Sequence, residues 1–310
     1  MATFLERYQA GDRAAVWKDL VALGEGVRHK LYYADAAAVA AETMRRARHN
    51  VELLIQRLDA MGYRFLTMQA GEENHRAALG RLYEIHKQVA SKAARRLDWM
   101  AFLKSPEGRQ AVEEAAEHSR AMAIEFIGSS LDQPVAPLKN RNVLDPPSEQ
   151  TARDLDTLEK MAGGPLPLSL RAWYEQVGGV SLLGWHSALH PNADEPAGLS
   201  GTCPDPLMIE RLDLLLEMVE EEYERGEGRE IRLSLAPDET FKAGEGGGGP
   251  YEMAIPNPCA DGIFEDGHGR TFVNYLRNAF AWGGFPGWEC DKKRSPREAL
   301  AKLAEGLLPI

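Results

Sequence analysis

The sequence predicts an α+β protein in which an N-terminal all-α helical bundle precedes a mixed sheet-and-helix domain. Up to about residue 130 the apolar residues recur at helical spacing. Beyond residue 150 both helical spacing and the alternation typical of strands occur. The stretch between them, "DQPVAPLKNRNVLDPPSEQ", contains four prolines and neither pattern. We therefore expect a bundle over residues 1–132, a linker over 133–149 and an α+β domain over 150–310.

Helix start and stop signals place four helices in the predicted bundle. We expect them over residues 12–24, 35–62, 72–102 and 105–128. Asp12 and Asp35 suit the positions before the first helical turn, and glycines follow the ends of three of the helices. Pro106 fits a first turn because its missing N–H would have no partner there. Antiparallel packing of these helices is the simplest arrangement.

The predicted C-terminal domain contains elements of both kinds. Strands are expected at "VSLLGW", "DPLMI", "EIRLSL" and "YEMAI", and helices over residues 155–162, 167–177, 212–219, 271–282 and from 295 onward. Gly178 and Gly179 stop the second of these helices, since glycine accepts the left-handed conformation of many helix ends. Thr271 can cap a helix, and Ser295 with Glu298 predicts a capping box.

The net charge of −11 is unevenly distributed. Residues 1–150 hold 21 Lys and Arg against 20 Asp and Glu, which leaves 15 against 27 for the rest, so the halves carry +1 and −12. An acidic half repels phosphate backbones and attracts basic partners, mainly through the association rate. The open alternative is that the charge only keeps the protein soluble.

Composition indicates a folded cytoplasmic protein. Hydrophobic residues make up 44% of the chain, no apolar stretch approaches the length of a bilayer span, and "MATFLERYQAGDR" lacks the order of a secretory signal. The three cysteines, Cys203, Cys259 and Cys290, are widely spaced and are expected to be free thiols in a reducing compartment. We expect no contact with a membrane.

Possible metal and cofactor sites have weak support in the sequence. "GEGGGG" satisfies GxGxxG, but a proline and a strand pattern follow it where a dinucleotide site requires a helix. His186, His190 and Asp194 lie in a proline-containing loop, which favours ordinary loop histidines over zinc ligands. Glu72 and His75 have the spacing of a di-iron motif but lack the second copy that such a site needs. We expect no metal and no cofactor.

Catalysis and nucleic-acid binding are also not indicated. Cys259, Asp261 and His268 could form a nucleophile, base and orienting group, but no neighbouring feature signals an activated thiol. The basic clusters "MRRARH" and "KAARR" lie on predicted helices of a nearly neutral half, so solvated charges are the simpler interpretation. The sequence predicts that the protein is not an enzyme and does not bind nucleic acid.

A run of glutamates suggests a surface that binds a basic protein. The run lies near a predicted helix C-terminus. Negative charge there destabilises the helix by roughly a few tenths of a kcal/mol, because the helix dipole has its negative end at the C-terminus. Further carboxylates follow the strand "YEMAI". The predicted acidic surface comprises Glu220, Glu221, Glu222, Asp261, Glu265 and Asp266.

The segment "WGGFPGW" concentrates aromatic residues in a glycine-rich turn. If Phe285 and Trp288 are exposed, they are candidate hot spots for the same partner. The alternative, which burial energetics favours, is that they cover the sheet and are mostly buried. Trp173 is expected in the core.

Residues 148–290 resemble the SUKH superfamily, the Smi/Knr-type group of fungal cell-wall-synthesis regulators and bacterial toxin-immunity proteins. The resemblance rests on a short helix, then "LP", then an aromatic helix, a glycine turn and a strand. The matching residues are Leu158, Glu159, Leu166, Pro167, Trp173, Tyr174, Gly178 and Gly179, with "DPLMI" following. Gly178 stands where the common pattern has asparagine.

The resemblance implies a mixed α+β fold and a role in binding proteins. Bacterial members of the group typically neutralise a toxin from neighbouring cells, so we expect an immunity-type inhibitor of a basic toxin domain. The alternative is a regulatory or scaffold adaptor whose two domains bind separate partners. An enzyme without a recognisable motif is the third possibility.

Overall fold

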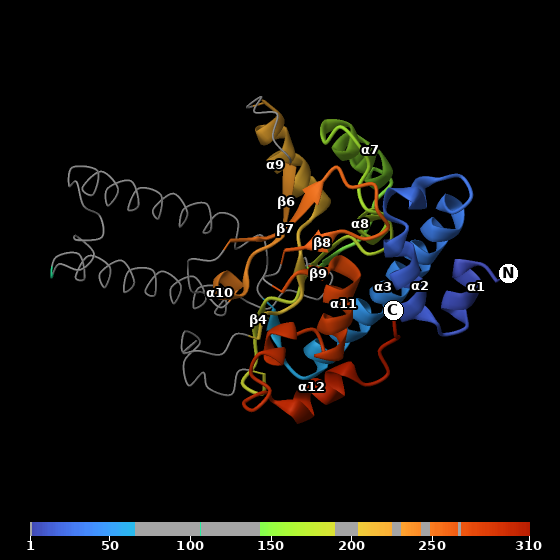
Figure 1. The fold of residues 1–310 in the computed structure, drawn as a ribbon. Helices are drawn as coiled ribbons and strands as arrows, with labels where there is room; N and C mark the ends of the chain where they lie inside the picture. The colour runs from blue at the N-terminus through green and yellow to red at the C-terminus, as the bar shows by residue number, and fades with distance from the viewer. Residues whose placement is uncertain are drawn as a thin grey trace.

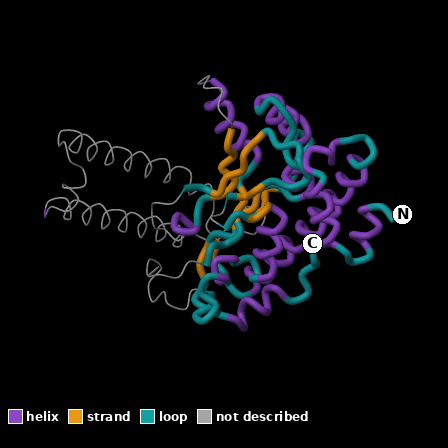
Figure 2. The backbone as a smooth tube through the Cα atoms, in the orientation of Figure 1, coloured by secondary structure: helices purple, strands orange, loops and turns teal. Residues whose placement is uncertain are grey.

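The computed structural model describes residues 2–65, 106, 143–189, 204–224, 231–242, 249–265 and 268–310. These parts form a mixed α+β fold, with strands gathered at the centre and helices around them (Figures 1 and 2). The described helices are α1 (Phe4–Gln9), α2 (Arg13–Ala22), η1 (Gly24–Arg28), α3 (Tyr33–Ala60), α7 (Thr151–Met161), α8 (Leu168–Gln176), α9 (Leu212–Glu224), α10 (Glu239–Lys242), α11 (Phe272–Ala281), η3 (Pro286–Glu289) and α12 (Arg297–Ala304). The predicted α+β class is confirmed.

The described strands are short and antiparallel. They are β1 (Arg64–Phe65), β2 (Leu144–Asp145), β3 (Gly179–Ser181), β4 (Gly184–Trp185), β5 (Met208–Ile209), β6 (Ile231–Ala236), β7 (Tyr251–Ile255), β8 (Ile263–Phe264) and β9 (Arg270–Thr271). They pair in the orders β2-β3-β5, β6-β7, β8-β9 and β1-β4. The Glu210 N–H donates to the Leu235 carbonyl at 2.7 Å, which joins β5 to β6, and a bridge between Glu252 and Glu265 joins β7 to β8. These contacts connect β2-β3-β5, β6-β7 and β8-β9 into one central layer.

The N-terminal helices agree with the prediction in their position but not in the side chains that cap them. α2 and α3 match two predicted helices, whereas those predicted over 72–102 and 105–128 lie outside the described residues apart from Pro106. Asp35 does not cap its own helix: its carboxylate accepts the N–H groups of Phe4 at 2.6 Å and Leu5 at 3.1 Å. A capping box between Thr3 and Glu6 completes the start of α1.

The glycine pair after α8 is required by the backbone. Gly178 has a φ of +90°, in the left-handed region that glycine adopts at little cost. A Cβ on Gly178 would lie 2.0 Å from the carbonyl oxygen of Asp145 in β2. The glycine therefore ends α8, as predicted, and allows β2 and β3 to pair closely.

The N-terminal and C-terminal halves share one hydrophobic core. α3 packs against α8, and the buried residues of both halves form one cluster. Tyr63, which follows α3, donates its hydroxyl to the Leu182 carbonyl at 2.9 Å, and its ring centroid lies 5.9 Å from that of Phe285. In addition, β1 pairs with β4. These contacts correct the predicted division at residues 133–149, since residues on both sides of it are packed together and β2 lies within it.

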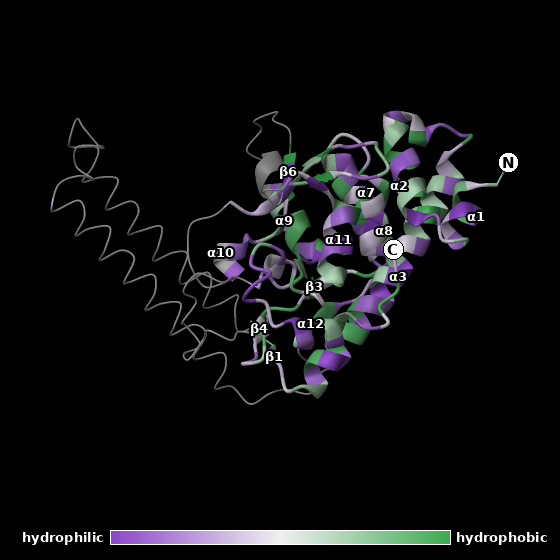
Figure 3. Cartoon of the chain, turned by 60° about the horizontal axis from the view of Figure 1, so that its bottom comes forward, coloured by the Kyte–Doolittle hydropathy of each residue, from purple (hydrophilic) through white to green (hydrophobic). Residues whose placement is uncertain are grey.

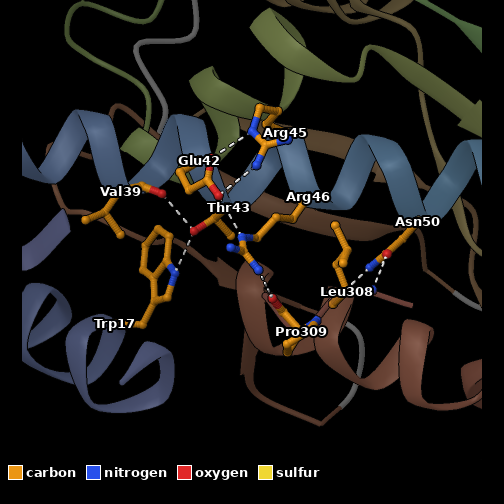
Figure 4. Close-up of polar contacts among 9 residues, drawn as sticks. All are labelled: Trp17, Val39, Glu42, Thr43, Arg45, Arg46, Asn50, Leu308 and Pro309. Carbon is orange, nitrogen blue, oxygen red and sulfur yellow. Dashed lines mark hydrogen bonds and ion pairs between the residues drawn. The ribbon is translucent and has the colours of Figure 1, made fainter. Parts of the chain in front are cut away.

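The last residues of the chain lie along α3 (Figure 4). Asn50, whose side chain is buried, donates to the Leu308 carbonyl at 2.9 Å and accepts the Leu308 N–H at 2.7 Å. Arg57 donates to the Leu303 carbonyl at 2.7 Å, and Ile310 is buried. In the same view, Trp17 donates to Thr43, whose hydroxyl in turn donates to the Val39 carbonyl. α3 therefore anchors both α2 and the C-terminal segment.

We expect Asn50→Ala to lower the free energy of unfolding by about 2 kcal/mol, because the substitution leaves a donor and an acceptor of Leu308 without their partner. Urea denaturation followed by circular dichroism measures the change. Gln56→Ala, at an exposed position of the same helix, is the control and should change the stability by less than about 0.5 kcal/mol. Equal stability of the Asn50 and Gln56 variants would contradict this account of the junction.

The last helix begins differently from the prediction. α12 starts at Arg297 after Pro296, and Ser295 does not cap it: the Ser295 hydroxyl donates to the Lys292 carbonyl at 3.0 Å. The expected capping box is therefore wrong. Because serine hydroxyls bond readily to nearby carbonyls, the local turn satisfies Ser295 before the helix begins.

Hydrophilic and hydrophobic residues alternate along the helices (Figure 3). Within the described parts of the chain, no helix combines the length and the apolar composition that crossing a bilayer requires.

Candidate functional site

The acidic run lies on α9, whose two faces differ in chemistry. Leu215 and Val219 are buried on one face and join the shared core. Asp213, Glu217 and Glu220 are exposed and follow one another at the i, i+4, i+7 spacing that places side chains on one side of a helix. The sequence folds this way because the apolar positions of α9 recur with the helical period. We call Asp213, Glu217 and Glu220, together with the exposed Met218 on the flank of this side, the acidic stripe.

Two carboxylates of the acidic stripe are available to a partner. Asp213 forms an ion pair with Arg211, but within the described residues neither Glu217 nor Glu220 pairs with a cation. Met218, the residue after Glu217, is 40% exposed and projects from the flank of the stripe. A flexible thioether in this position suits contact with a protein surface, because methionine adapts to irregular apolar partners. The stripe can therefore offer both charge and apolar contact.

The rest of the predicted glutamate run is only partly located. Glu221 and Glu222 continue α9, and the structure describes their backbone but not their side chains. Asp266 lies outside the described residues. Of the predicted run, the structure thus places the exposed side chain of Glu220 and the helical backbone of the two residues after it.

Glu265 is exposed and follows β8, which is two strands away from β6 in the central layer. Because α9 packs against β6, Glu265 is not next to the acidic stripe in the order of strands. Arg232 donates to Glu265 at 2.5 Å, and Glu252 lies 4.0 Å from the same guanidinium. Ile263, which is 52% exposed, lies on the same face as Glu265 because it comes two residues before Glu265 in the chain. The charge of Glu265 is partly neutralised by Arg232, so this carboxylate contributes less attraction than those of α9.

Asp261 is buried and bonded, so it is removed from the predicted acidic surface. Ser169 donates its hydroxyl to Asp261 Oδ1 at 2.6 Å, and the Val273 N–H donates to Oδ2 at 3.2 Å. The carboxyl thus caps the start of α11 where Thr271 was expected to do so. Burial raises the pKa of Asp261 to about 6, against the hydrogen bonds from Ser169, Thr271 and Val273, which lower it.

The raised pKa predicts how stability depends on pH. Because the folded state binds the Asp261 proton more tightly than the unfolded state does, this residue contributes stability below about pH 4 that is lost as the pH rises through about 6. Asp261→Asn cannot titrate and keeps an acceptor oxygen. Relative to this variant, we expect the wild type to lose about 2 kcal/mol between pH 4 and 7. Denaturation curves at several pH values measure the difference, and a pH-independent difference would contradict the assignment.

Phe285 and Trp288 belong to the core and not to an exposed surface. Phe285 has no exposed area, and Trp288 is 1% exposed. Trp288 lies in η3, which the chain reaches after α11 through Gly283 and Gly284. The structure therefore corrects the predicted partner surface at these two residues and agrees with the alternative that they are buried. Removal of their rings from water explains their position.

A buried polar cluster lies where the sequence shows no motif. The Lys242 side chain is fully buried and donates to Asp205 Oδ1 at 2.5 Å, and its Nζ lies 4.8 Å from the centroid of the Tyr251 ring. The Tyr251 hydroxyl lies 2.8 Å from Glu239 Oε2. Burial, together with the nearby carboxylates of Asp205 and Glu239, raises the pKa of Tyr251 far above its usual range.

This cluster joins three segments that are separate in the sequence: the residues before β5, α10 and β7. Asp205, Glu239, Lys242 and Tyr251 are spread over 47 positions, as residues 205–251, so no local spacing signals them. The lysine side chain is buried and paired with Asp205, so the cluster connects these segments within the fold.

Of the remaining sequence candidates, Cys259 is described and partly buried. Burial raises the pKa of the Cys259 thiol, which disfavours the reactive thiolate. His190, Asp194, Glu72 and His75 lie outside the described residues, as does most of "GEGGGG". No set of three His, Cys, Asp or Glu side chains is placed to hold a metal ion in the parts that the structure describes.

The basic cluster "MRRARH" is partly neutralised on α3, where two glutamates pair with its three arginines. Arg45 and Arg46 both pair with Glu42 at 2.7 Å, as Figure 4 shows, and Arg48 pairs with Glu52 at 2.7 Å. The cluster "KAARR" lies outside the described residues. Guanidinium groups already paired with carboxylates offer little attraction to phosphates.

Comparisons of the chain with protein-family models, with curated proteins and with solved structures find no match. The resemblance to the SUKH superfamily therefore stays a prediction from the residues of α7, α8 and the turn after them.

Proposed function

We propose that the protein is a non-catalytic, protein-binding protein of SUKH type that acts as an immunity-type inhibitor of a basic toxin domain. The observation that carries the proposal is the acidic stripe of α9. Glu217 and Glu220 are exposed on one side of the helix, and Met218 supplies an exposed apolar side chain on its flank. Carboxylates gathered on one surface speed encounter with a basic partner, because the long-range attraction orients the two molecules before contact.

The inhibition itself would come from occlusion. A standard protein interface covers about 800 Å² on each partner, enough to block a toxin's own site without any bond being made or broken. The shared core supports this mode, because a partner bound to α9 meets a helix packed on β6 and α7. A helix fixed in this way loses little freedom on binding.

Charge reversal on the acidic stripe tests the proposal. The wild-type protein is immobilised and used to capture proteins from extracts of its own source cells, and a captured protein is then purified. We expect a basic protein whose association rate falls at least about tenfold with Glu217→Lys/Glu220→Lys at low salt. We also expect the wild type, and not this variant, to abolish the captured protein's toxicity when the two are co-expressed.

Glu25→Lys/Glu305→Lys provides the control, because both glutamates are exposed, lie in η1 and directly after α12, and change the net charge equally. It should associate nearly as fast as the wild type. If both double variants slow association equally, only the net charge matters. If neither does, or if the captured protein is acidic, the proposed surface is wrong.

A further inference from the structure

Most of the exposed large hydrophobic side chains in the described residues lie in the N-terminal half. Four of the six large hydrophobic side chains that are most exposed lie within residues 21–33, and Leu31, at 72%, exceeds all the others. The six are Val21, Leu31, Tyr32, Tyr33, Met218 and Ile263. We call residues 29–33, "HKLYY", the N-terminal tip. Exposed apolar side chains gathered in one short segment are typical of an interaction surface.

The N-terminal tip has a fixed conformation. The N–H groups of Tyr32 and Tyr33 donate to the His29 carbonyl at 2.9 and 3.0 Å. Arg28, immediately before the tip, donates to the carbonyls of Pro258, at 3.0 Å, and Leu166. Its guanidinium lies 5.5 Å from the centroid of the Tyr33 ring. Because the exposed tyrosines are held before any partner arrives, binding through them costs little conformational entropy.

The charge around the N-terminal tip is opposite to that of the acidic stripe. Lys18, His29 and Lys30 are exposed. Residues 18–33 contain two carboxylates, Asp19 and Glu25, and Asp19 is paired with Arg7 at 2.7 Å. Figures 1 and 3 show the N-terminal helices α1 and α2 away from α9. The tip shares no residue with the acidic stripe, so it is an apolar surface of its own with basic residues in it.

We propose that the N-terminal tip is a second protein-binding surface, which takes an acidic amphipathic segment of a partner protein. Apolar side chains of that segment pack on Leu31 and the two tyrosine rings, and its carboxylates lie beside Lys30 and His29. Tyrosine rings are frequent energetic centres of interfaces, and the lysine selects the sign of the partner's charge. This site goes beyond the proposed function, because it uses different residues and a partner of opposite charge.

Selection from a phage library of random peptides tests the proposal without a known partner. The library is first depleted on the variant Lys30→Glu/Leu31→Glu and then selected on the wild type. We expect the recovered peptides to combine Asp or Glu with large apolar residues. A labelled consensus peptide should bind the variant at least about tenfold more weakly than the wild type, and wild-type binding should weaken with salt.

Two control variants establish whether the peptide binds at the tip itself. Ile263→Glu/Lys293→Glu makes the same changes at exposed positions elsewhere and should bind the peptide like the wild type. Glu217→Lys/Glu220→Lys should also bind it, so the tip is tested independently of the acidic stripe. Unfolding curves establish that each variant is folded.

Several results would overturn the proposal. They are a basic consensus, equal binding to the tip variant, self-association of the purified protein that the tip variant abolishes, and tip-dependent binding to anionic lipid vesicles. The last two would assign the tip to a second copy or to a lipid surface.

Discussion

Trp173→Ala is expected to lower the free energy of unfolding by about 3–5 kcal/mol. Trp173 has no exposed area, and its ring meets that of Phe272 edge to face, with centroids 5.6 Å apart. The residue lies on α8, which packs against α3 on one side and α11 on the other. The substitution thus leaves a cavity between three helices, and the surrounding side chains are too constrained to fill it. Urea denaturation followed by circular dichroism measures the loss.

Leu31→Ala is the matched control for an apolar truncation. Because Leu31 is 72% exposed, its truncation should change the stability by less than about 0.5 kcal/mol. A Trp173 variant as stable as the Leu31 variant would mean that α8 does not lie at the centre of the core.

The second large effect is expected from Lys242→Met, which leaves the buried Asp205 carboxylate without its cation. Breaking a buried ion pair from one side typically costs about 3–5 kcal/mol, because the remaining charge stays in the interior unpaired. The Asp205 side chain is 8% exposed, and its backbone has a φ of +44°, a conformation that aspartate and asparagine tolerate better than most residues.

Two causes can contribute to the stability loss of Lys242→Met: the lost attraction of the ion pair and the unpaired charge left on Asp205. The double variant Lys242→Met/Asp205→Asn distinguishes them, because it also removes the charge. Asparagine removes the charge and keeps the tolerance for the left-handed backbone. We expect the double variant to be more stable than Lys242→Met alone, as measured by the same denaturation curves. If the two losses simply add, the pair does not interact in the way that its 2.5 Å distance indicates.

Local periodicity predicts the long elements of this fold well. The apolar residues of α8 recur at the helical period, and the glycine pair that ends this helix is set by a local backbone requirement. The strand β7 alternates buried and partly buried residues along its length, and β6 alternates more buried and less buried residues up to its last two, as their sequences predict. These features depend on neighbours within a few residues, so the sequence shows them directly.

Features that depend on distant partners are not visible locally. Asp261 resembles an exposed loop carboxylate until Ser169, 92 positions earlier, packs beside it. Asp35 has the sequence position of a cap for α3 but serves α1. For the candidate site, the exposed Glu220 is predicted because the helical period of α9 turns it away from the apolar face. The prediction that Phe285 and Trp288 belong to an exposed partner surface is wrong, because composition does not say which side of a turn meets the core.

The domain boundary is the largest difference between prediction and structure. A proline-rich stretch between helical and mixed patterns is typical of a linker, yet contacts on both sides of it join α3 to α8 and Tyr63 to Phe285. Composition reports local backbone preferences and not the packing of distant helices. We therefore treat the described α3, α8 and α11 as one folded body that carries the acidic stripe.

Hydrogen exchange with mass spectrometry, at increasing denaturant below the unfolding transition, tests this single body most directly. If α3 shares its core with α8 and α11, the most protected amides of all three helices should exchange with one free energy of opening, within about 0.5 kcal/mol, and one dependence on denaturant. Exchange of α3 at a distinctly lower free energy, while α8 and α11 remain protected, would show that the N-terminal helices fold separately and would contradict the account.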